Sequence, residues 1–374
     1  MVRSMRIGVD ISAVIGAGGG LQRYTERLLD ALLRVDTENH YFFIAAYWRN
    51  HPRELTALEL PSGPNAEIVS PRWPQGLMVY ADRYLGLSPV PALAHRLKLD
   101  IWHGVGNQLP RLGGVPGVVT LHHVGGIADT SGGWEHRWNA QARYSIPRAN
   151  RVIAISEHTK ADLVEQWSIP RDSISVVYHG VEKSFRPEAA AGALPDGVED
   201  RYILFTSAIR KRKNLEVLVR AYARIKGALQ LVLCGYRSEY YRSLRTLCLE
   251  LGIVKRVLFL EDLSDRDLAR LYARALLFVY PSKWEGFGLP ILEAMACGTP
   301  VVAARAASLP EVAGDAALYF DPDSPEDLAA AIRKALEPSA ASRLSAAGLA
   351  RAAGFTWERT ASETIEVYKR TLSR

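Results

Sequence analysis

Short apolar runs alternate with helix-length segments along most of the chain. Each run has four or five mainly aliphatic, β-branched or aromatic residues, as expected for strands buried in a parallel sheet. Strands are predicted at residues 7–10, 41–45, 66–69, 100–103, 118–121, 152–155, 174–178, 202–205, 229–233, 257–260 and 276–280. Because helices separate these strands, the pattern predicts doubly wound parallel α/β sheets.

The alternation is interrupted between residues 183 and 200 by an Ala-, Gly- and Pro-rich run. Such a composition is typical of a linker. We therefore predict a first domain over residues 1–185, a linker over 186–200 and a second α/β domain over 201–355. Within the second domain, Ser264 with Asp267 and Ser324 with Asp327 resemble capping boxes at helix starts.

In the second domain, one strand with its following loop and helix carries several residues that could bind a ligand. The strand ends at Pro281, Pro290 fits the first position of a helix, and Gly298 marks the end of that helix. The first N–H groups of such a helix have no intrahelical acceptor and can bind a phosphate; they lie near Phe287, Gly288 and Leu289. Glycine at 286 and 288 allows a ligand to approach the backbone closely.

Two carboxylates, Glu285 and Glu293, flank this loop. Beside a phosphate site, one could accept hydrogen bonds from a ribose diol and the other from a sugar ring. Taken singly, Glu293 could instead stabilise the helix dipole and Glu285 could be a solvated loop charge. Their combination with the two glycines favours the binding role. We expect Glu285→Ala to abolish activity without a large change in stability, because a loop carboxylate facing a cleft supports little core.

A second glycine loop follows the first predicted strand, with Gly16, Gly18, Gly19 and Gly20 before a helix. It fails as a dinucleotide fingerprint, because Leu21 occupies the last glycine position and the strand at 41–45 is not followed by a ribose-binding acid. The alternative is a loop that only requires positive φ.

The nine residues from Glu285 to Glu293, EGFGLPILE, resemble the signature of family 4 retaining glycosyltransferases. The surrounding sequence from 257–260 to Asp321-Pro322 resembles the same family. This resemblance implies the GT-B fold, in which two Rossmann-like domains face each other across a cleft. It also implies that the C-terminal domain binds a nucleotide sugar, that the N-terminal domain presents the acceptor, and that the helix at 356–374 packs back on the first domain.

The resemblance also implies roles for residues outside this signature. Lys213-Asn214-Leu215 resembles a motif with a diphosphate-binding lysine, and Ser207 stands where some relatives have an arginine, so Arg210 or Arg212 could replace that charge. His122, followed by His123, resembles the strand-end histidine beside the donor sugar, and His103 resembles another family position. Gly19 and Gly20 would approach the donor phosphates.

Composition narrows the choice of partners. The chain has 374 residues, enough for two domains, and a net charge of +6, which fits a nucleoside diphosphate or an anionic membrane surface without requiring either. We find no nucleic-acid recognition motif. The three cysteines lack metal-ligand or paired spacing, which indicates a reducing compartment. No run approaches the ~18 apolar residues of a membrane span, so we expect no signal peptide or transmembrane helix.

The apolar and aromatic segment at residues 76–87 has three interpretations. It could line an acceptor cleft, contact a membrane or pack as an ordinary helix, and the general behaviour of such stripes favours packing. We expect a cytoplasmic protein, with peripheral contact at the inner face of the membrane as its alternative location.

The resemblance, together with these observations, implies a retaining hexosyltransferase that uses a nucleoside-diphosphate sugar and a sugar or lipid-linked acceptor, in cell-surface polysaccharide or glycolipid synthesis. The sequence of residues Gly19–Tyr24 favours mannose, supplied by GDP-mannose, as the transferred sugar. Rhamnose, glucose and N-acetylglucosamine are the alternatives. We expect neither cofactor nor metal, because no Asp-x-Asp motif is placed to hold one. The alternatives are a nucleotide-sugar epimerase or phosphorylase on the same fold, and a non-catalytic nucleotide-sugar binding protein.

Overall fold

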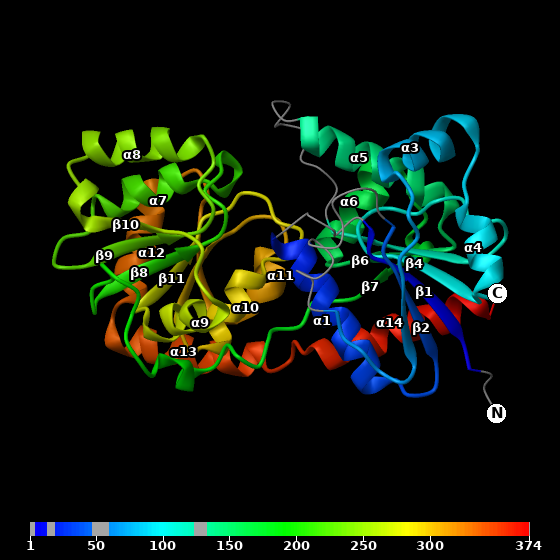
Figure 1. Cartoon of the computed structure of the whole chain (residues 1–374). Coiled ribbons are helices and arrows are strands. Elements are labelled where there is room, and N and C mark those ends of the chain that lie inside the picture. Colours follow the sequence, from blue (N-terminus) through cyan, green and yellow to red (C-terminus); the bar gives the residue numbers. More distant parts are fainter. Residues whose placement is uncertain (1–3, 13–18, 47–59, 123–132, 374) are drawn as a thin grey trace. The chain divides into compact units, whose positions relative to one another are not determined.

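The computed structural model describes residues 4–12, 19–46, 60–122 and 133–373 (Figure 1). The chain divides into two compact units, one formed by Met1–Gly180 with Trp357–Arg374 and the other by Val181–Thr356. Each unit is built on a parallel sheet with helices on its faces. The predicted doubly wound α/β architecture is therefore confirmed.

The described part of the first unit holds a seven-stranded sheet in the order β3-β2-β1-β4-β5-β6-β7. Its central strands are buried, which explains their continuous apolar sequences. The strand order reverses between β1 and β4, where Asp10 is paired with Gly104. The strands are β1 (Arg6–Asp10), β2 (His40–Ile44), β3 (Ala66–Val69), β4 (Ile101–Gly104), β5 (Gly117–Leu121), β6 (Arg151–Ala154) and β7 (Ile174–Val176).

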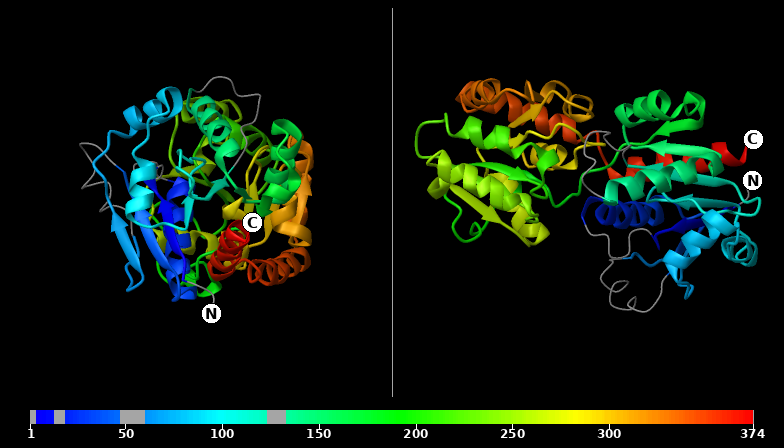
Figure 2. Two further views of the ribbon diagram at one scale, coloured as in Figure 1. Left: turned by 90° about the vertical axis from the view of Figure 1, so that its right-hand side faces the viewer. Right: turned by 90° about the horizontal axis from the view of Figure 1, so that it is seen from above.

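Helices cover both faces of this sheet. α1 (Gly19–Val35) and α14 (Trp357–Leu372) contribute to the core on one face, and α4 (Val90–Arg96), α5 (Gly133–Ser145) and α6 (Glu157–Trp167) to the core on the other. Figure 2 shows α14 in red among the elements of the first unit, and it packs along α1. Trp357, Ala361 and Tyr368 of α14 are buried there, so the end of the chain completes the core of its first unit.

The segment at 76–87 does not pack as an ordinary buried helix. It forms α3 (Gln75–Tyr80) and a π-helical turn, η2 (Ala81–Leu85). Its apolar side chains are 55–64% exposed at Leu77, Tyr80, Tyr84, Leu85 and Leu87. The favoured sequence interpretation is wrong for these residues, because helical periodicity cannot tell whether another layer covers the apolar side of a helix.

The described part of the second unit holds a six-stranded parallel sheet in the order β10-β9-β8-β11-β12-β13. The order reverses between β8 and β11, which pair directly. The strands are β8 (Tyr202–Thr206), β9 (Gln230–Cys234), β10 (Val257–Leu260), β11 (Leu277–Tyr280), β12 (Val301–Ala304) and β13 (Ala317–Phe320). The last two were not predicted, because their sequences, VVAA and ALYF, are short and contain alanine, which is a weak strand former.

Helices flank this sheet too, with α7 and α8 on one face and α9, α10 and α13 on the other (Figure 1). Both predicted caps are confirmed, since Ser264 Oγ accepts from Asp267 N at 3.1 Å and Ser324 Oγ from Asp327 N at 3.1 Å. The helices are α7 (Leu215–Tyr222), α8 (Tyr240–Glu250), α9 (Asp265–Arg274), α10 (Leu289–Ala296), α11 (Leu309–Ala313), α12 (Pro325–Ala335) and α13 (Pro338–Ala352).

Residues 181–200 belong to the second unit, although their composition is that of a linker. Phe185 is 3% exposed and meets the Tyr272 ring edge-on at a centroid distance of 5.6 Å. The side chain of Gln230 binds Gly197 O and Glu199 N. The first unit therefore ends at Gly180, before the predicted boundary at 185, because the apolar and polar anchors of this segment pack on the second sheet.

Candidate functional site

The loop between β11 and α10 lies at the carboxyl end of a central strand, beside the reversal of strand order in the second sheet. Open α/β sheets bind ligands at this position. α10 begins at Leu289, so Pro290 occupies the second helical position. Gly288 caps the helix at φ +106°, a conformation that glycine adopts without strain. Gly298 at φ +76° follows its last turn, as predicted for the helix end.

Lys213 reaches the same edge from β8. It ends a 3₁₀ turn, η6 (Lys211–Lys213), and is followed by Asn214 at φ +56°. The Asn214 amide donates to Pro281 O at 3.1 Å and to Pro322 O at 2.7 Å. These bonds fasten the turn after β8 to the end of β11, and so fix Lys213 next to the loop that carries Glu285.

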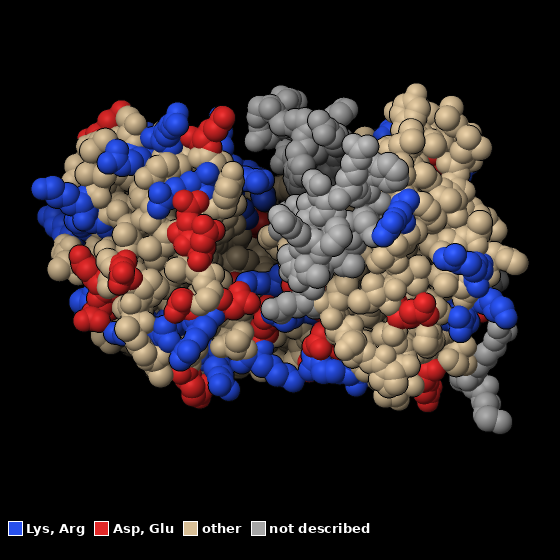
Figure 3. Space-filling model, in the orientation of Figure 1, with Lys and Arg blue, Asp and Glu red and all other residues tan. Residues whose placement is uncertain are grey.

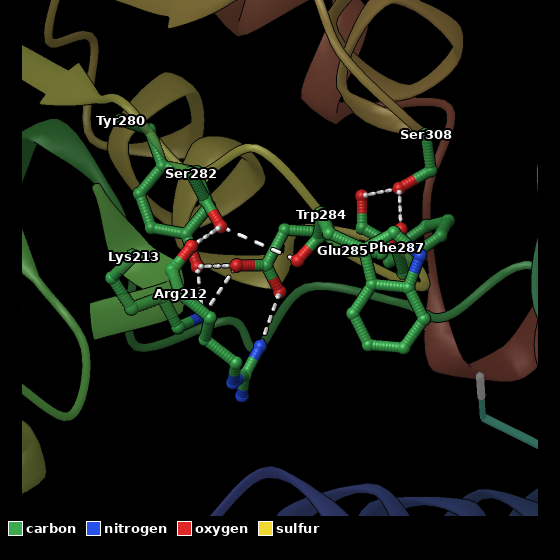
Figure 4. Close-up of polar contacts among 8 residues, drawn as sticks. All are labelled: Arg212, Lys213, Tyr280, Ser282, Trp284, Glu285, Phe287 and Ser308. Atoms are coloured by element: carbon green, nitrogen blue, oxygen red, sulfur yellow. Dashed lines mark hydrogen bonds and ion pairs between the residues drawn. The ribbon is translucent and has the colours of Figure 1, made fainter. Parts of the chain in front are cut away.

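Glu285 and Lys213 form a buried ion pair (Figure 4). Their side chains are only 11% and 4% exposed, and Glu285 Oε1 is bound by Lys213 Nζ and, at 3.1 Å, by the Tyr280 hydroxyl. Lys213 Nζ also donates to Tyr280 at 2.9 Å. Arg212 Nη1 lies 3.9 Å from the other carboxylate oxygen, Oε2. Two cations therefore face one carboxylate.

The pKa values of this pair follow from burial and charge. Burial alone would raise the pKa of Glu285, but the charges of Lys213 and Arg212 outweigh it and lower that pKa to about 2. Burial lowers the pKa of Lys213 to about 8, opposed by Glu285 and assisted by the charges of Arg212 and Arg210. At neutral pH the Glu285 carboxylate is ionised and the Lys213 ammonium is charged, so Lys213 can also bind a second anion.

Two serines that the sequence interpretation missed hold the loop in place. Ser308 Oγ lies 2.9 Å from Glu285 O and 2.8 Å from Phe287 O, so its one hydroxyl hydrogen is shared between two carbonyls of the turn before α10 (Figure 4). Ser282 Oγ donates to Trp284 O at 3.3 Å. No sequence spacing identifies a serine that binds loop carbonyls, because the folded loop places these carbonyls next to the serine.

The residues predicted to bind the nucleotide-sugar donor differ in exposure and in their contacts. Arg210 and Arg212 were both predicted as replacements for the arginine absent at Ser207. Arg210 is exposed, whereas Arg212 lies 3.9 Å from the Glu285 carboxylate. Phe287 is 3% exposed and packs edge-on against Phe355. Glu293 is 5% exposed, and its Oε2 accepts from the Tyr272 hydroxyl at 2.7 Å. Glu293 thus has a structural partner, Tyr272, that the sequence interpretation did not include, since it considered only ligand hydroxyls and the helix dipole.

In the first unit, His122 follows β5. Its ring Nε2 donates to Val105 O at 2.8 Å, which leaves Nδ1 as the acceptor nitrogen of a neutral ring. Its ring also meets that of Tyr24 edge-on, with centroids 4.6 Å apart. Burial lowers the pKa of His122 to about 4, although the bond to Val105 opposes this. A neutral His122 can accept a hydroxyl hydrogen bond, but it does not supply positive charge.

The other residues proposed in the first unit differ in how closely they are held. His103 is fully buried between the Tyr368 hydroxyl and Thr120 Oγ1, each 2.7 Å from a ring nitrogen. Gly19, at φ +68°, and Gly20 begin α1 and are exposed. Gly16, Gly18 and His123 lie outside the described residues.

The chain contains two Asp-x-Asp triplets, Asp265–Asp267 and Asp321–Asp323. Both lie at helix starts: Asp267 Oδ2 accepts from the Ser264 hydroxyl, and Asp321 Oδ1 accepts from the Asp323 backbone N–H. Within the part of the chain that the structure describes, no group of three or more His, Cys, Asp or Glu side chains could hold a metal ion.

Two family matches cover most of the chain. Residues 18–185 match the family described as Glycosyltransferase Family 4, and residues 191–351 match Glycosyl transferases group 1. The chain belongs to glycosyltransferase family 4. The family residues proposed from the EGFGLPILE signature, Glu285 to Glu293, fall within the second match.

Relatives in this family include the O-antigen chain mannosyltransferase B of Escherichia coli, 35% identical over 60% of this chain and 62% of the relative. A serotype-specific mannosyltransferase of the same organism, WbdA, is 33% identical over 60% of this chain, which aligns with only 29% of that longer protein. The D-inositol 3-phosphate glycosyltransferase of Nocardioides sp. is 29% identical over 95% of this chain and 86% of its own.

Solved structures share the fold of this family 4 member. Sucrose-phosphate synthase from Thermosynechococcus elongatus superposes with a TM-score of 0.79 at 22% identity, over 99% of both chains. HepE from Anabaena, solved with UDP and glucose, gives a TM-score of 0.72 at 20% identity, over 98% of this chain and 100% of HepE. At these identities the likeness establishes the GT-B fold.

Proposed function

We propose that this protein is a retaining glycosyltransferase that moves a hexosyl residue from a nucleoside-diphosphate sugar to a hydroxyl of a sugar or lipid-linked acceptor. The observation that carries the proposal is the buried Lys213–Glu285 pair beside the start of α10, at the strand-order reversal of the second sheet. Mannose is the sugar we favour, since two relatives are named as mannosyltransferases. Their names also suggest synthesis of a surface polysaccharide.

The difficult step is departure of the nucleoside diphosphate as negative charge grows on its oxygens. The Lys213 ammonium, Arg212 and the N–H groups at the start of α10 are fixed donors that would stabilise this charge. Glu285 Oε1 is engaged by Lys213 and Tyr280, so Oε2 is the oxygen that would accept from a sugar hydroxyl. Glu285 then orients the sugar and, by pairing with Lys213, places the ammonium.

In the transfer, the bond from the sugar C1 to the diphosphate oxygen breaks and its electron pair leaves with the diphosphate. The acceptor oxygen bonds to C1 on the same face, and its proton passes to a departing phosphate oxygen. No carboxylate is assigned to the opposite face, since Glu285 is committed to Lys213 and the sugar hydroxyls. His122 would accept from a donor-sugar hydroxyl through Nδ1.

A donor panel tests the proposal. GDP-mannose, UDP-glucose, UDP-N-acetylglucosamine and a nucleoside-diphosphate rhamnose would be compared by thermal unfolding, because a ligand that binds the native state raises Tm by mass action. We expect GDP-mannose to give the largest shift and to be consumed with an added glycan acceptor. Turnover of donor alone to an epimer or a sugar phosphate would favour the epimerase or phosphorylase alternative, and binding without any turnover would favour a binding protein.

The same assay tests the proposal that no metal is required. Activity should survive EDTA, because the charge on the leaving group is balanced by Lys213, Arg212 and α10. Complete loss of activity, restored by magnesium or manganese, would show that this electrostatic account lacks its main charge.

We also propose a cytoplasmic location with peripheral contact at the inner face of the membrane. The exposed side chains of α3 and η2 support it: Leu77, Tyr80, Tyr84, Leu85 and Leu87. The surface over α3 is mostly free of charged residues (Figure 3). Among the described helices, none is long and apolar enough to cross a bilayer.

A further inference from the structure

Tyr280, the last residue of β11, lies beside the two charged groups of the proposed donor site. Its side chain is 1% exposed, and its ring stacks nearly parallel to those of Phe205 and Phe278, with centroids 5.9 and 5.8 Å away. The packed core therefore holds the hydroxyl in a fixed place. The sequence interpretation counted Tyr280 only as the end of a strand and gave it no role.

The Tyr280 hydroxyl makes one hydrogen bond with each partner of the buried ion pair (Figure 4). It accepts from Lys213 Nζ at 2.9 Å and donates to Glu285 Oε1 at 3.1 Å. Because Lys213 Nζ also binds Glu285 Oε1, the three polar atoms form a closed triangle. A phenylalanine would fit the same aromatic packing without either bond, so packing alone does not explain a tyrosine at this position.

The triangle determines where the Lys213 ammonium can make its third hydrogen bond. An ammonium has three N–H donors, and two of them are directed to Glu285 Oε1 and to the Tyr280 hydroxyl. With Glu285 as its one acceptor, Nζ could swing about its bond to Oε1. A second acceptor from a different element fixes the direction of the remaining N–H, for which the described residues supply no acceptor.

The same hydroxyl orients the carboxylate. Glu285 Oε1 receives hydrogen bonds from both Lys213 and Tyr280, which directs the second oxygen, Oε2, to the side where Arg212 Nη1 lies 3.9 Å away. In the proposed transfer, Oε2 accepts from a sugar hydroxyl and the third N–H of Lys213 binds the diphosphate. One hydroxyl therefore holds both groups in the geometry that the transfer needs.

We propose that Tyr280 is a positioning residue of this transferase, whose hydroxyl directs the Lys213 ammonium to the leaving diphosphate and the Glu285 carboxylate to the sugar. The inference deepens the proposed function and rests on it, because the two groups that Tyr280 positions act in that transfer. In this role Tyr280 acts through Lys213 and Glu285 and not on the donor itself.

Removing the hydroxyl should also change the pH dependence. Burial, opposed by Glu285, sets the pKa of Lys213 at about 8, and loss of an acceptor that binds the charged form lowers this pKa. The charged groups facing Lys213 are Glu285, Arg212 and Arg210. Arginine stays charged and the pKa of Glu285 is about 2. Burial and the charge of Glu285 raise the pKa of Tyr280 well above its ordinary value, so Lys213 is the group of this cluster that titrates near pH 8.

Tyr280→Phe tests the proposal, with Tyr202→Phe as its matched control. Tyr202 lies in β8 of the same unit, is fully buried and donates to Leu271 O at 2.7 Å, so its substitution also removes one buried hydroxyl. Each protein would be assayed across pH by the release of GDP from GDP-mannose with methyl α-mannoside as acceptor. The pKa of Lys213 would be followed without donor, by NMR of isotopically labelled lysine side chains assigned with Lys213→Arg.

In Tyr280→Phe we expect kcat to fall by ~10–100-fold, because a misplaced cation loses most where charge develops in the transition state. The affinity for GDP should fall less. The decline of kcat/KM at high pH and the pKa of Lys213 should both move down by about one unit, as expected for one lost hydrogen bond to a charged group. Tyr202→Phe should keep the wild-type values. A wild-type pH profile and Lys213 pKa in Tyr280→Phe, or the same loss of kcat in both variants, would overturn the proposal.

A second pair of variants keeps the ring and the hydroxyl, so that the fold is not asked to tolerate the loss of a buried partner. With 3-fluorotyrosine in place of Tyr280, the hydroxyl oxygen is a weaker hydrogen-bond acceptor, and the pKa of Lys213 should fall in the same direction but by less. The same replacement at Tyr202 should leave that pKa unchanged. No shift from position 280, or equal shifts from the two positions, would contradict the role of Tyr280.

Failure of the proposed function would look different. In that case the wild type would consume none of the donors in the panel, whatever the pKa of Lys213. If the wild type consumes its donor while Tyr280→Phe keeps the wild-type kcat, pH profile and Lys213 pKa, the transferase stands and the role of Tyr280 falls.

Discussion

At the scale of single residues, the Lys213–Glu285 pair joins stability to function. Both groups are buried, so each compensates the charge of the other. The expectation that Glu285 is a loop carboxylate of little structural weight rested on its loop position. Its side chain is 11% exposed and bound to Lys213, and removing it leaves a buried ammonium without its partner.

Glu285→Gln should therefore abolish transfer and also lower the free energy of unfolding by roughly 3–5 kcal/mol, as for other broken buried pairs. Because its pKa falls from 4.5 to about 2 on folding, the carboxylate stabilises the wild type above pH 4.5 and loses this effect as pH falls toward 2. Urea unfolding across that range should show an acid-dependent loss of unfolding free energy that the variant lacks.

Glu326→Gln is the control, since it removes an exposed pair with Arg224. It should lower the free energy of unfolding by under about 1 kcal/mol. Equal losses of stability in the two variants would contradict the assignment.

The pKa of Lys213 predicts a second pH effect. Only the charged ammonium stabilises a diphosphate, and its pKa of about 8 means that the charge is lost above that pH in the free enzyme. The value of kcat/KM for the donor should decline as pH rises through 8. Lys213→Arg should move this decline to higher pH, because arginine stays charged; a pH profile identical to that of the wild type would exclude Lys213 as its cause.

At the scale of elements, the start of α10 depends on a backbone that only glycine adopts without strain. Gly288 has φ +106°, and a Cβ there would lie 2.9 Å from Leu309 Cδ2. Gly227 has nearly the same φ, +105°, and a Cβ there would meet nothing within 4 Å. The two positions therefore separate backbone strain from steric contact.

Gly227→Ala should destabilise the protein by about 1 kcal/mol through backbone strain alone. Gly288→Ala should cost about 1–3 kcal/mol more, because Leu309 must also move. Nucleoside diphosphate affinity, measured by calorimetry, should fall only in the Gly288 variant. Undiminished binding there would separate the start of α10 from the donor site.

The exposed face of α3 and η2 carries its own prediction. The double variant Leu85→Ser, Leu87→Ser should sediment less with vesicles that contain phosphatidylglycerol than the wild type does, because two side chains that are more than 60% exposed lose their apolar contact with the interface. Leu249→Ser, at a leucine 51% exposed in the second unit, should sediment like the wild type. Equal sedimentation of all three proteins would show that this face does not bind the membrane.

At the scale of the whole molecule, the proposed donor site lies where the strand order of the second sheet reverses, beside β8 and β11. The roles proposed for its residues predict the stereochemistry of the complete reaction. The product should keep the anomeric configuration of the donor, since no base or nucleophile is assigned to the face opposite the leaving group. Proton NMR of the first-formed product from an α-linked donor decides it, and a β-linked product would overturn the roles of Glu285 and His122.

The sequence alone determined the local features of this protein. Strand positions such as 202–205 and 257–260, the loop and helix after Pro281, and the serine caps at 264 and 324 were all predicted correctly. Each depends on residues close together in the chain: apolar runs of strand length, glycines that allow positive φ, and hydroxyls three residues before an N–H. The EGFGLPILE stretch added the family, because its spacing is specific.

Only the tertiary structure decided which distant residues meet and which faces are covered. Lys213 and Glu285 are 72 residues apart, and Asn214 joins them only once β8 and β11 lie side by side. The Tyr272 hydroxyl donates to Glu293 only in the folded core. Phe185 packs against Tyr272, so a segment with the composition of a linker belongs to the second unit. Apolar side chains of α3 remain exposed. Periodicity reports that a face is apolar, but burial depends on the layers that pack against it, and those are set by contacts between parts of the chain that the sequence keeps far apart.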